Sequence, residues 1–218
     1  MLVIRVLMIA SLLLLCQLAA AGAYEDMIDA VKRDDTGRIG IKPALKQGAD
    51  APRIVPFNGI DQEGNTLLML AAKEGSKKSA KQLLSVRARV NTQNGLGETA
   101  LMLAALQGHL EIARELVTHG ANVNIPGWTP LIYAAVNGHV NMTRLLIAFG
   151  AQVNAVGDNG FTALIMATRE GHAELVSLLL ANGADFNLKT VDGLTALDIA
   201  RARKHAGLVG ALVKAGAR

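Results

Sequence analysis

The sequence predicts an all-α repeat solenoid, in which small helical units stack one upon the next. A threonine recurs with spacings of 33, 30, 33 and 33 residues, at Thr66, Thr99, Thr129, Thr162 and Thr195. A glycine or its replacement follows nine residues later, at Gly75, Gly108, Gly138, Gly171 and Lys204. Paired aliphatic residues such as Leu116-Val117 recur at the same interval. A fixed period of this size indicates units that bury their apolar faces only against neighbours.

Residues 94–124 show the first half of one unit. Gly97 lies in a predicted turn with positive φ, a conformation that glycine adopts without a Cβ clash. Thr99 follows at an N-cap position, where its hydroxyl can accept a hydrogen bond from the first turn of a helix. Thr129-Pro130 supports this placement, because proline is favoured at the first position of a helix. An inner helix is therefore predicted after each threonine.

The second half of the unit predicts a turn and an outer helix. Ala104 and Ala105 keep the inner helix thin, and Gly108-His109 turns the chain. Apolar residues then recur at helical spacing, at Leu110, Ile112, Ala113, Leu116 and Val117. Gly120 is expected to end the outer helix in the left-handed conformation.

Taken together, these features resemble the ankyrin repeat. The T-x-L box, the Ala-Ala pair, the Gly-His turn, the paired aliphatic residues and the Gly-Ala exit ending in Asn match that family's pattern from about Asp61 to Arg218. The resemblance implies two antiparallel helices and a hairpin-like loop in each unit. It also implies that the hairpin tips and inner helices form a concave binding face.

The first 23 residues have the layout of a secretory signal peptide. Arg5 supplies a positive start, an apolar run follows, and small residues crowd positions 19–23. We favour cleavage after Ala23, with Ala21 as the other candidate, so that Tyr24 begins the mature chain. The alternative is an uncleaved anchor, because the eighteen residues 6–23 are long enough to span a bilayer.

The rest of the chain is predicted to hold six units. Residues 24–60 are read as a degenerate capping repeat and a loop insert, with an inner helix at 26–35, an outer helix at 41–47 and a six-residue insert within 51–60. Residues 61–218 are read as five ankyrin-type repeats. The hairpin before Thr129 is three residues short, and Arg87 replaces the glycine that ends an outer helix. Such changes fall on the loop face of a solenoid and spare the helical stack.

Charge and cysteine usage limit the function classes. Without residues 1–23, 21 Lys and Arg face 18 Asp and Glu, and the net charge of +3 is too small and too dispersed to indicate nucleic-acid binding. The single cysteine, Cys16, lies within the predicted signal peptide. The mature chain would therefore hold no thiol, which suits an oxidising compartment.

No catalytic, cofactor or metal site is predicted. His109, His139, His172 and His205 occupy one repeat position, and adjacent units stack too far apart for these rings to share a zinc ion. The resemblance implies that they tie each turn to neighbouring backbone. Residues 95–100 fit a dinucleotide-binding pattern, but no strand or β-α-β unit surrounds them. We therefore expect a protein that is not an enzyme.

The resemblance places candidate binding residues on the hairpin tips and inner helices. An apolar patch is expected to be exposed in the middle of the array, with Trp128 either anchoring a partner or shielding the shortened hairpin. The apolar candidates are Leu96, Leu106, Trp128, Val136, Phe161 and Leu194. The polar candidates are Glu98, Gln107, Asn137, Asp158, Asn159 and Arg169.

The expected function is a monomeric protein-binding scaffold in the periplasm or outside the cell, with no nucleic-acid partner and no stable membrane insertion after signal cleavage. Two narrower roles are suggested by what exported bacterial proteins of this type do. One is an accessory factor for a periplasmic enzyme, such as a catalase, in oxidative defence. The other is an immunity protein that blocks a toxin. The partner itself cannot be read from the repeat frame.

Overall fold

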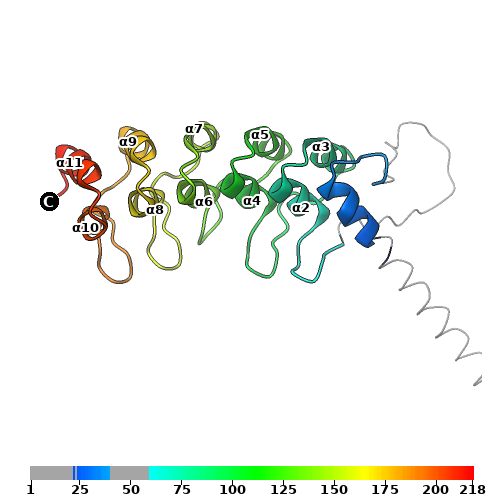
Figure 1. Ribbon diagram of the computed structural model, residues 1–218, viewed down its shortest axis with the longest axis horizontal. Helices are drawn as coiled ribbons and strands as arrows, with labels where there is room; N and C mark the ends of the chain where they lie inside the picture. The colour runs from blue at the N-terminus through cyan, green and yellow to red at the C-terminus, as the bar shows by residue number, and fades with distance from the viewer. Residues whose placement is uncertain (1–21, 23, 40–58) are drawn as a thin grey trace, which may run out of the picture.

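The computed structural model describes residues 22, 24–39 and 59–218. Within this part the predicted all-α repeat solenoid is confirmed: the helices stack in pairs along one row, and no strand is formed (Figure 1). The pairs are α2 (Leu67–Glu74) with α3 (Lys77–Ser85), α4 (Ala100–Gln107) with α5 (Leu110–Thr118), α6 (Pro130–Val136) with α7 (Val140–Ala148), α8 (Ala163–Glu170) with α9 (Ala173–Ala181), and α10 (Ala196–Ala202) with α11 (Ala206–Lys214).

The helices form two layers, with a row of loops along one side. The inner helices α2, α4, α6, α8 and α10 pack against one another in sequence, and the outer helices α3, α5, α7, α9 and α11 form a second row. All of the loops that precede the inner helices project to the same side of the stack (Figure 1). This arrangement places every hairpin tip on one face.

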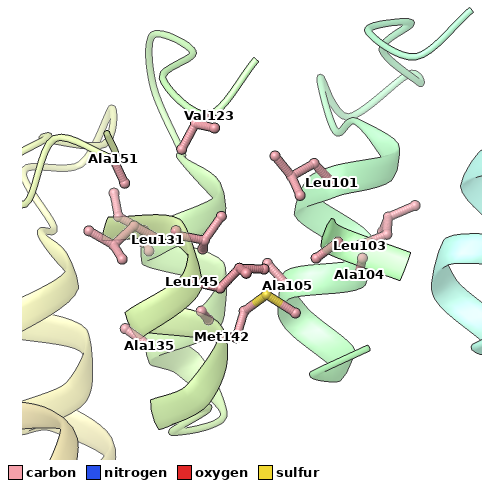
Figure 2. Close-up of a cluster of buried hydrophobic side chains, with 14 of the residues drawn as sticks. Leu101, Leu103, Ala104, Ala105, Val123, Leu131, Ala135, Met142, Leu145 and Ala151 are labelled. Carbon is pink, nitrogen blue, oxygen red and sulfur yellow. The ribbon is translucent and has the colours of Figure 1, made fainter. Parts of the chain in front are cut away.

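The core is a continuous apolar seam between neighbouring units. Figure 2 shows side chains of α4, α6 and α7 directed into this seam. Ala104 and Ala105 are completely buried, and their small size lets adjacent inner helices lie close together. On the outer helices, Ile112 and Leu116 fill the same seam. Each unit therefore depends on its neighbours for most of its burial.

The five recurring threonines cap the inner helices, as predicted. Each hydroxyl accepts a hydrogen bond from the amide three residues later, at 3.3 Å for Thr66, 3.4 Å for Thr99, 3.3 Å for Thr129, 3.2 Å for Thr162 and 3.2 Å for Thr195. In the last unit the Asp198 carboxylate also accepts hydrogen bonds from the hydroxyl and amide of Thr195, at 2.7 and 3.0 Å. These hydrogen bonds lower the pKa of Asp198.

Histidines join each unit to the one before it, which confirms their predicted structural role. The Nε2 atoms of His109, His139, His172 and His205 lie 3.2, 2.9, 3.0 and 3.4 Å from carbonyl oxygens of the preceding inner helix. A carbonyl can only accept, so Nε2 must carry the proton. The ring also sits on the glycine of the preceding turn: a Cβ on Gly75 would lie 2.6 Å from the His109 ring. The glycine is therefore needed for space as well as for its φ of 75°.

The first junction uses a different polar contact. Ser76 stands where the later units have histidine, and Asp34 of the first unit reaches α3 instead. The Asp34 carboxylate accepts hydrogen bonds from the amides of Lys78 and Ser79, at 3.2 and 2.8 Å, and from the Ser79 hydroxyl at 2.9 Å. Ser79 is completely buried, so Asp34 provides acceptors for donors that lie away from water. It also caps a helix that receives no cap from Ser76.

The hairpin before Thr129 differs from the other four, as its shorter sequence predicted. In the hairpin before Thr99, Gly97 donates to the Asn94 carbonyl and Asn94 donates to the Glu98 carbonyl, both at 3.0 Å. The same pair of backbone bonds recurs in the hairpins before Thr66, Thr162 and Thr195. Across the described residues this pair is missing before Thr129, and the loop before α6 projects less far than its neighbours (Figure 1).

Several predicted segments lie outside the described residues. They are the signal peptide at 1–23 apart from Gly22, the outer helix at 41–47 and the insert at 51–60 apart from its last two residues. The inner helix predicted at 26–35 is in the described part, where residues 24–32 are helical and Met27, Ala30 and Val31 are buried against the stack.

Arg87 occupies the position at which the other four outer helices are followed by a left-handed glycine, namely Gly120, Gly150, Gly183 and Gly216. Its φ is 60°, and Gly120, one period later, has a φ of 88°. The same two bonds close both helix ends. Arg87 and Ala88 donate to the carbonyls of Leu84 and Leu83, both at 3.0 Å, and Gly120 and Ala121 donate to those of Val117 and Leu116 at 3.0 and 2.9 Å. These bonds therefore hold the residue that follows the outer helix in the left-handed region, whether it is Arg87 or a glycine.

We predict that Arg87→Gly stabilises the fold by about 0.5–1 kcal/mol, because the relief of strain at positive φ exceeds the added freedom of the unfolded chain. Thermal and urea unfolding would measure the change. The reciprocal variant, Gly120→Ala, has open space around its Cβ and should lose stability through backbone strain alone. Equal or lower stability of Arg87→Gly would show that the left-handed position is not strained.

Candidate functional site

The residue before each capping threonine lies at the base of a hairpin tip, where the loop row meets the inner helices. These residues are Asn65, Glu98, Trp128, Phe161 and Leu194. Asn65 is 3% exposed, Leu194 is 43% exposed, and the other three are partly buried. The face therefore changes from polar in its first two units to apolar in its last three.

Hydrogen bonds connect the hairpins of three successive units. The Asn94 side-chain amide donates to Asn65 Oδ1 and to Glu98 Oε2, both at 2.9 Å. The Tyr133 hydroxyl, on α6, donates to Glu98 Oε1 at 3.0 Å. Asn94 Oδ1 also accepts from the amides of Leu96 and Glu98, at 3.0 and 2.9 Å. Glu98 and the loop that carries Leu96 are consequently held in place before any ligand arrives.

Trp128 and Tyr133 form an edge-to-face aromatic pair. Their ring centroids are 5.6 Å apart and the rings are inclined by 70°. The Trp128 ring reaches the next hairpin, where a Cβ on Gly157 would lie 3.3 Å from it. Because Trp128 is partly buried and packs against the core, it covers the seam beside the shortened hairpin. Trp128 also lines a groove on the hairpin face.

This central groove has a volume of about 420 Å³ and crosses three units. Its lining residues are Gln93, Leu96, Gly97, Glu98, Met102, Pro126, Trp128, Tyr133 and Asp158. A second hollow of about 430 Å³ lies between the hairpin before Thr99 and the hairpin before Thr66. Leu96 and Glu98 line both this hollow and the central groove. Leu96 is 83% exposed, so it forms a ridge between two hollows.

The structure divides the predicted site residues into two groups. Leu96, Glu98, Trp128 and Asp158 line the central groove. The remaining predicted residues lie elsewhere along the inner helices and hairpins, namely Leu106, Gln107, Val136, Asn137, Asn159, Phe161, Arg169 and Leu194.

The apolar patch is less exposed than the sequence led us to expect. Trp128, Val136 and Phe161 are partly buried and pack against the core, and Leu106 is also partly buried. Leu96 alone among the five central apolar residues is exposed. The central surface is thus a half-buried groove with one protruding leucine.

Two further predicted residues, Asn137 and Arg169, make polar contacts within the chain. The Asn137 side-chain amide donates to the Leu106 carbonyl at 2.7 Å, in the same turn that holds the His139 ring. The Arg169 guanidinium lies 5.5 Å from the centroid of the Phe161 ring, a cation–π arrangement, and also pairs with Glu170 at 3.4 Å. These side chains are partly committed to contacts within the chain.

Tyr133 is the main residue that sequence reasoning missed. It stands four positions after the capping threonine, where the other inner helices carry Leu70, Leu103, Met166 and Ile199. An aromatic residue with a hydroxyl at an otherwise aliphatic position was a detectable signal. Gln93, Met102 and Pro126 also line the groove, and nothing in their local sequence marks them.

A larger hollow of about 670 Å³ lies at the N-terminal end of the same face, between residues 24–32 and α2. Its lining mixes acidic and basic side chains, such as Glu25, Asp61, Lys32 and Lys73. Two of its lining residues, Ile60 and Asp61, come shortly after residues 40–58 in the sequence, which the structure does not describe. The central groove is the better-defined candidate, because every segment around it is described.

The described residues show neither a metal-binding cluster nor a membrane-spanning helix. No group of three or more His, Cys, Asp or Glu side chains in this part is placed to hold a metal ion. None of the described helices has the length and apolar character needed to cross a membrane.

Comparison with known proteins gives one family match. A family model described as ankyrin repeats in three copies matches residues 68–157, 120–190 and 149–218, which together cover more than half of the chain. No curated protein matches the sequence.

Both tyrosines of the chain have raised pKa values. Burial, with the nearby charge of Asp61, raises the pKa of Tyr24 to about 12, and its hydroxyl donates to the Gly59 carbonyl at 2.6 Å. Burial, followed by the hydrogen bond to Glu98 and the charge of that carboxylate, raises the pKa of Tyr133 well above its ordinary value. Neutral tyrosine is therefore favoured in the folded chain.

We predict that the native protein shows little tyrosinate absorbance at pH of about 10.5, where the denatured chain is mostly ionised. The stability that the two groups contribute is fully present below the unfolded pKa of about 10 and is lost as the pH rises through the folded values. Ultraviolet titration of native and denatured protein measures this, with circular dichroism to confirm folding. Tyr24→Phe isolates Tyr133. A native Tyr133 that titrates near 10 would contradict the buried contact with Glu98.

Proposed function

The chain belongs to the ankyrin repeat family, and from this membership we propose that it is a non-catalytic scaffold that binds a protein through its hairpin and inner-helix face. Ankyrin repeats generally mediate protein–protein interaction. The observation that supports this particular face is Leu96, a large apolar side chain that is 83% exposed between two hollows.

Leu96 is held by polar contacts rather than by burial. Its own amide and that of Glu98 donate to the Asn94 side chain, and Asn94 is bonded in turn to Asn65 of the preceding unit. A loop that is already ordered loses little conformational entropy when it binds. Covering an exposed leucine in a complex contributes about 1.5–3 kcal/mol. A rigid, protruding apolar residue beside a groove therefore favours a protein contact at this point.

Leu96→Glu is expected to reduce recovery of the bound protein by about tenfold or more, because the burial of one leucine side chain is lost. The measurement is affinity capture from the cells of origin, followed by quantification of the recovered partner. The side chain makes no core contact that the substitution would remove, so the melting temperature should not change.

The matched control is Val213→Glu, which places the same charge on a half-exposed valine of the last outer helix. Capture should persist with this variant. Equal recovery with Leu96→Glu and Val213→Glu would exclude the proposed face. The identity of the captured protein then separates the narrower forms of the proposal, support of a periplasmic enzyme such as a catalase or neutralisation of a toxin.

We also propose that the protein acts in the periplasm or outside the cell. The support is the signal-peptide layout of residues 1–23, together with the absence of cysteine after Cys16 in the sequence.

N-terminal sequencing of the protein from fractionated cells is expected to give Tyr24 as the first residue, in the periplasmic or culture fraction. A variant with Ala21 and Ala23 both changed to Leu should retain the leader, because the small residues that a signal peptidase requires are gone. Wild-type protein that begins at residue 1 and stays with the membrane would instead establish the uncleaved anchor.

A further inference from the structure

The central groove places negative charge beside aromatic rings. Glu98 and Asp158 line it together with Trp128 and Tyr133, and no Lys, Arg or His is among its lining residues. The rest of the lining is Gln93, Leu96, Gly97, Met102 and Pro126. A groove of this composition is complementary to a cation that has apolar parts.

Both carboxylates have room for a further hydrogen bond. Each Glu98 oxygen accepts one, from Tyr133 or Asn94, and a carboxylate oxygen can accept two. Glu98 is thus oriented but not saturated. The Asp158 carboxylate is exposed and has no hydrogen-bond or ion-pair partner in the described part of the chain. Its oxygens lie close to Gly127, where a Cβ would be 3.2 Å from Oδ1.

The groove is open because of the shortened hairpin. Gly127 follows Gly120 by seven positions, whereas Gly160 follows Gly150 by ten. The hairpin between that of Leu96 and that of Asp158 therefore projects less far than its neighbours, and its Pro126 lines the groove. Carboxylates of the third and fifth units consequently border the same groove.

We propose that the central groove binds the side chain of an arginine in the partner protein. This inference rests on the proposed scaffold function and specifies the chemistry of the partner at that same site. A guanidinium can stack on an aromatic ring while it donates hydrogen bonds to carboxylates, and its aliphatic stem can pack along the exposed Leu96. A comparable arrangement occurs in the described part of the chain, where Arg169 lies over Phe161 and pairs with Glu170.

The test uses the full mature protein and two short peptides. Acetyl-Gly-Arg-Gly-amide is the probe, and the same peptide with citrulline replaces the charged guanidinium with a neutral group of the same shape. Trp128 is the only tryptophan of the chain, so its indole N–H resonance reports on this groove alone. The arginine peptide should shift that resonance saturably, with an affinity that falls as salt is added. The citrulline peptide should bind about tenfold more weakly or not at all.

The decisive variant is Glu98→Gln with Asp158→Asn, which removes both charges and keeps both side-chain shapes. The single amide oxygen that Glu98→Gln introduces can accept from Tyr133 or from Asn94 but not from both. Asn94 keeps its bonds to Asn65 and to the amides of Leu96 and Glu98, so the hairpin should stay folded, and a thermal melt checks this. Arginine-peptide affinity is expected to fall about tenfold. The matched control is Glu174→Gln with Asp192→Asn, which removes the same charge from an outer helix and from the last hairpin, and its affinity should equal that of the wild type.

Equal binding of the arginine and citrulline peptides, or equal affinity in the two double variants, would overturn the arginine site. This failure is distinguishable from failure of the scaffold face. If the arginine site is wrong, Leu96→Glu still reduces capture of the partner. If the hairpin face is not the partner-binding surface, the Leu96→Glu variant captures the partner as well as the wild type does. The peptide assay then still reports whether the groove binds arginine.

Discussion

The contact between a histidine and the glycine of the preceding turn is the interaction on which the rest of the stack depends. His109 sits on Gly75 and bonds to the Lys73 carbonyl, and the same contact recurs at three further junctions. It sets the register of the units at these four junctions, whereas Asp34 joins the first unit to α3. Because the register is constant, inner helices meet inner helices, and every hairpin emerges on the same face (Figure 1).

A solenoid of this kind separates stability from recognition. The seam of alanines and aliphatic residues needs only nearest neighbours, so a shortened loop changes the face without disturbing the core. The hairpin before Thr129 illustrates this: its backbone bond pair is missing in the described structure, yet Thr129 still caps α6. Trp128 covers the seam at this point, and the space above it becomes the central groove.

Positions governed by local backbone geometry were predictable. The capping threonines, the left-handed turn glycines and the replacement of glycine at Arg87 all follow from residues within one turn of the chain. The exposure of the candidate site residues was harder to predict. The exposure of Leu96 agrees with its place at a hairpin tip, whereas Phe161 and Val136 are partly buried against the core. A repeat pattern predicts on which face of its unit a residue lies, but not how much of its side chain is buried in the assembled stack.

The sequence by itself determined the unit, its period and the family, because caps, turns and apolar spacing act over a few residues. Tertiary structure decided which residues meet across units. Tyr133 bonds to Glu98 from 35 positions away, and Asp34 caps α3 from 45 positions away. Neither pairing follows any repeat motif, since each depends on two different side chains happening to face each other across the seam. The groove exists only where such contacts and a shortened hairpin coincide in space.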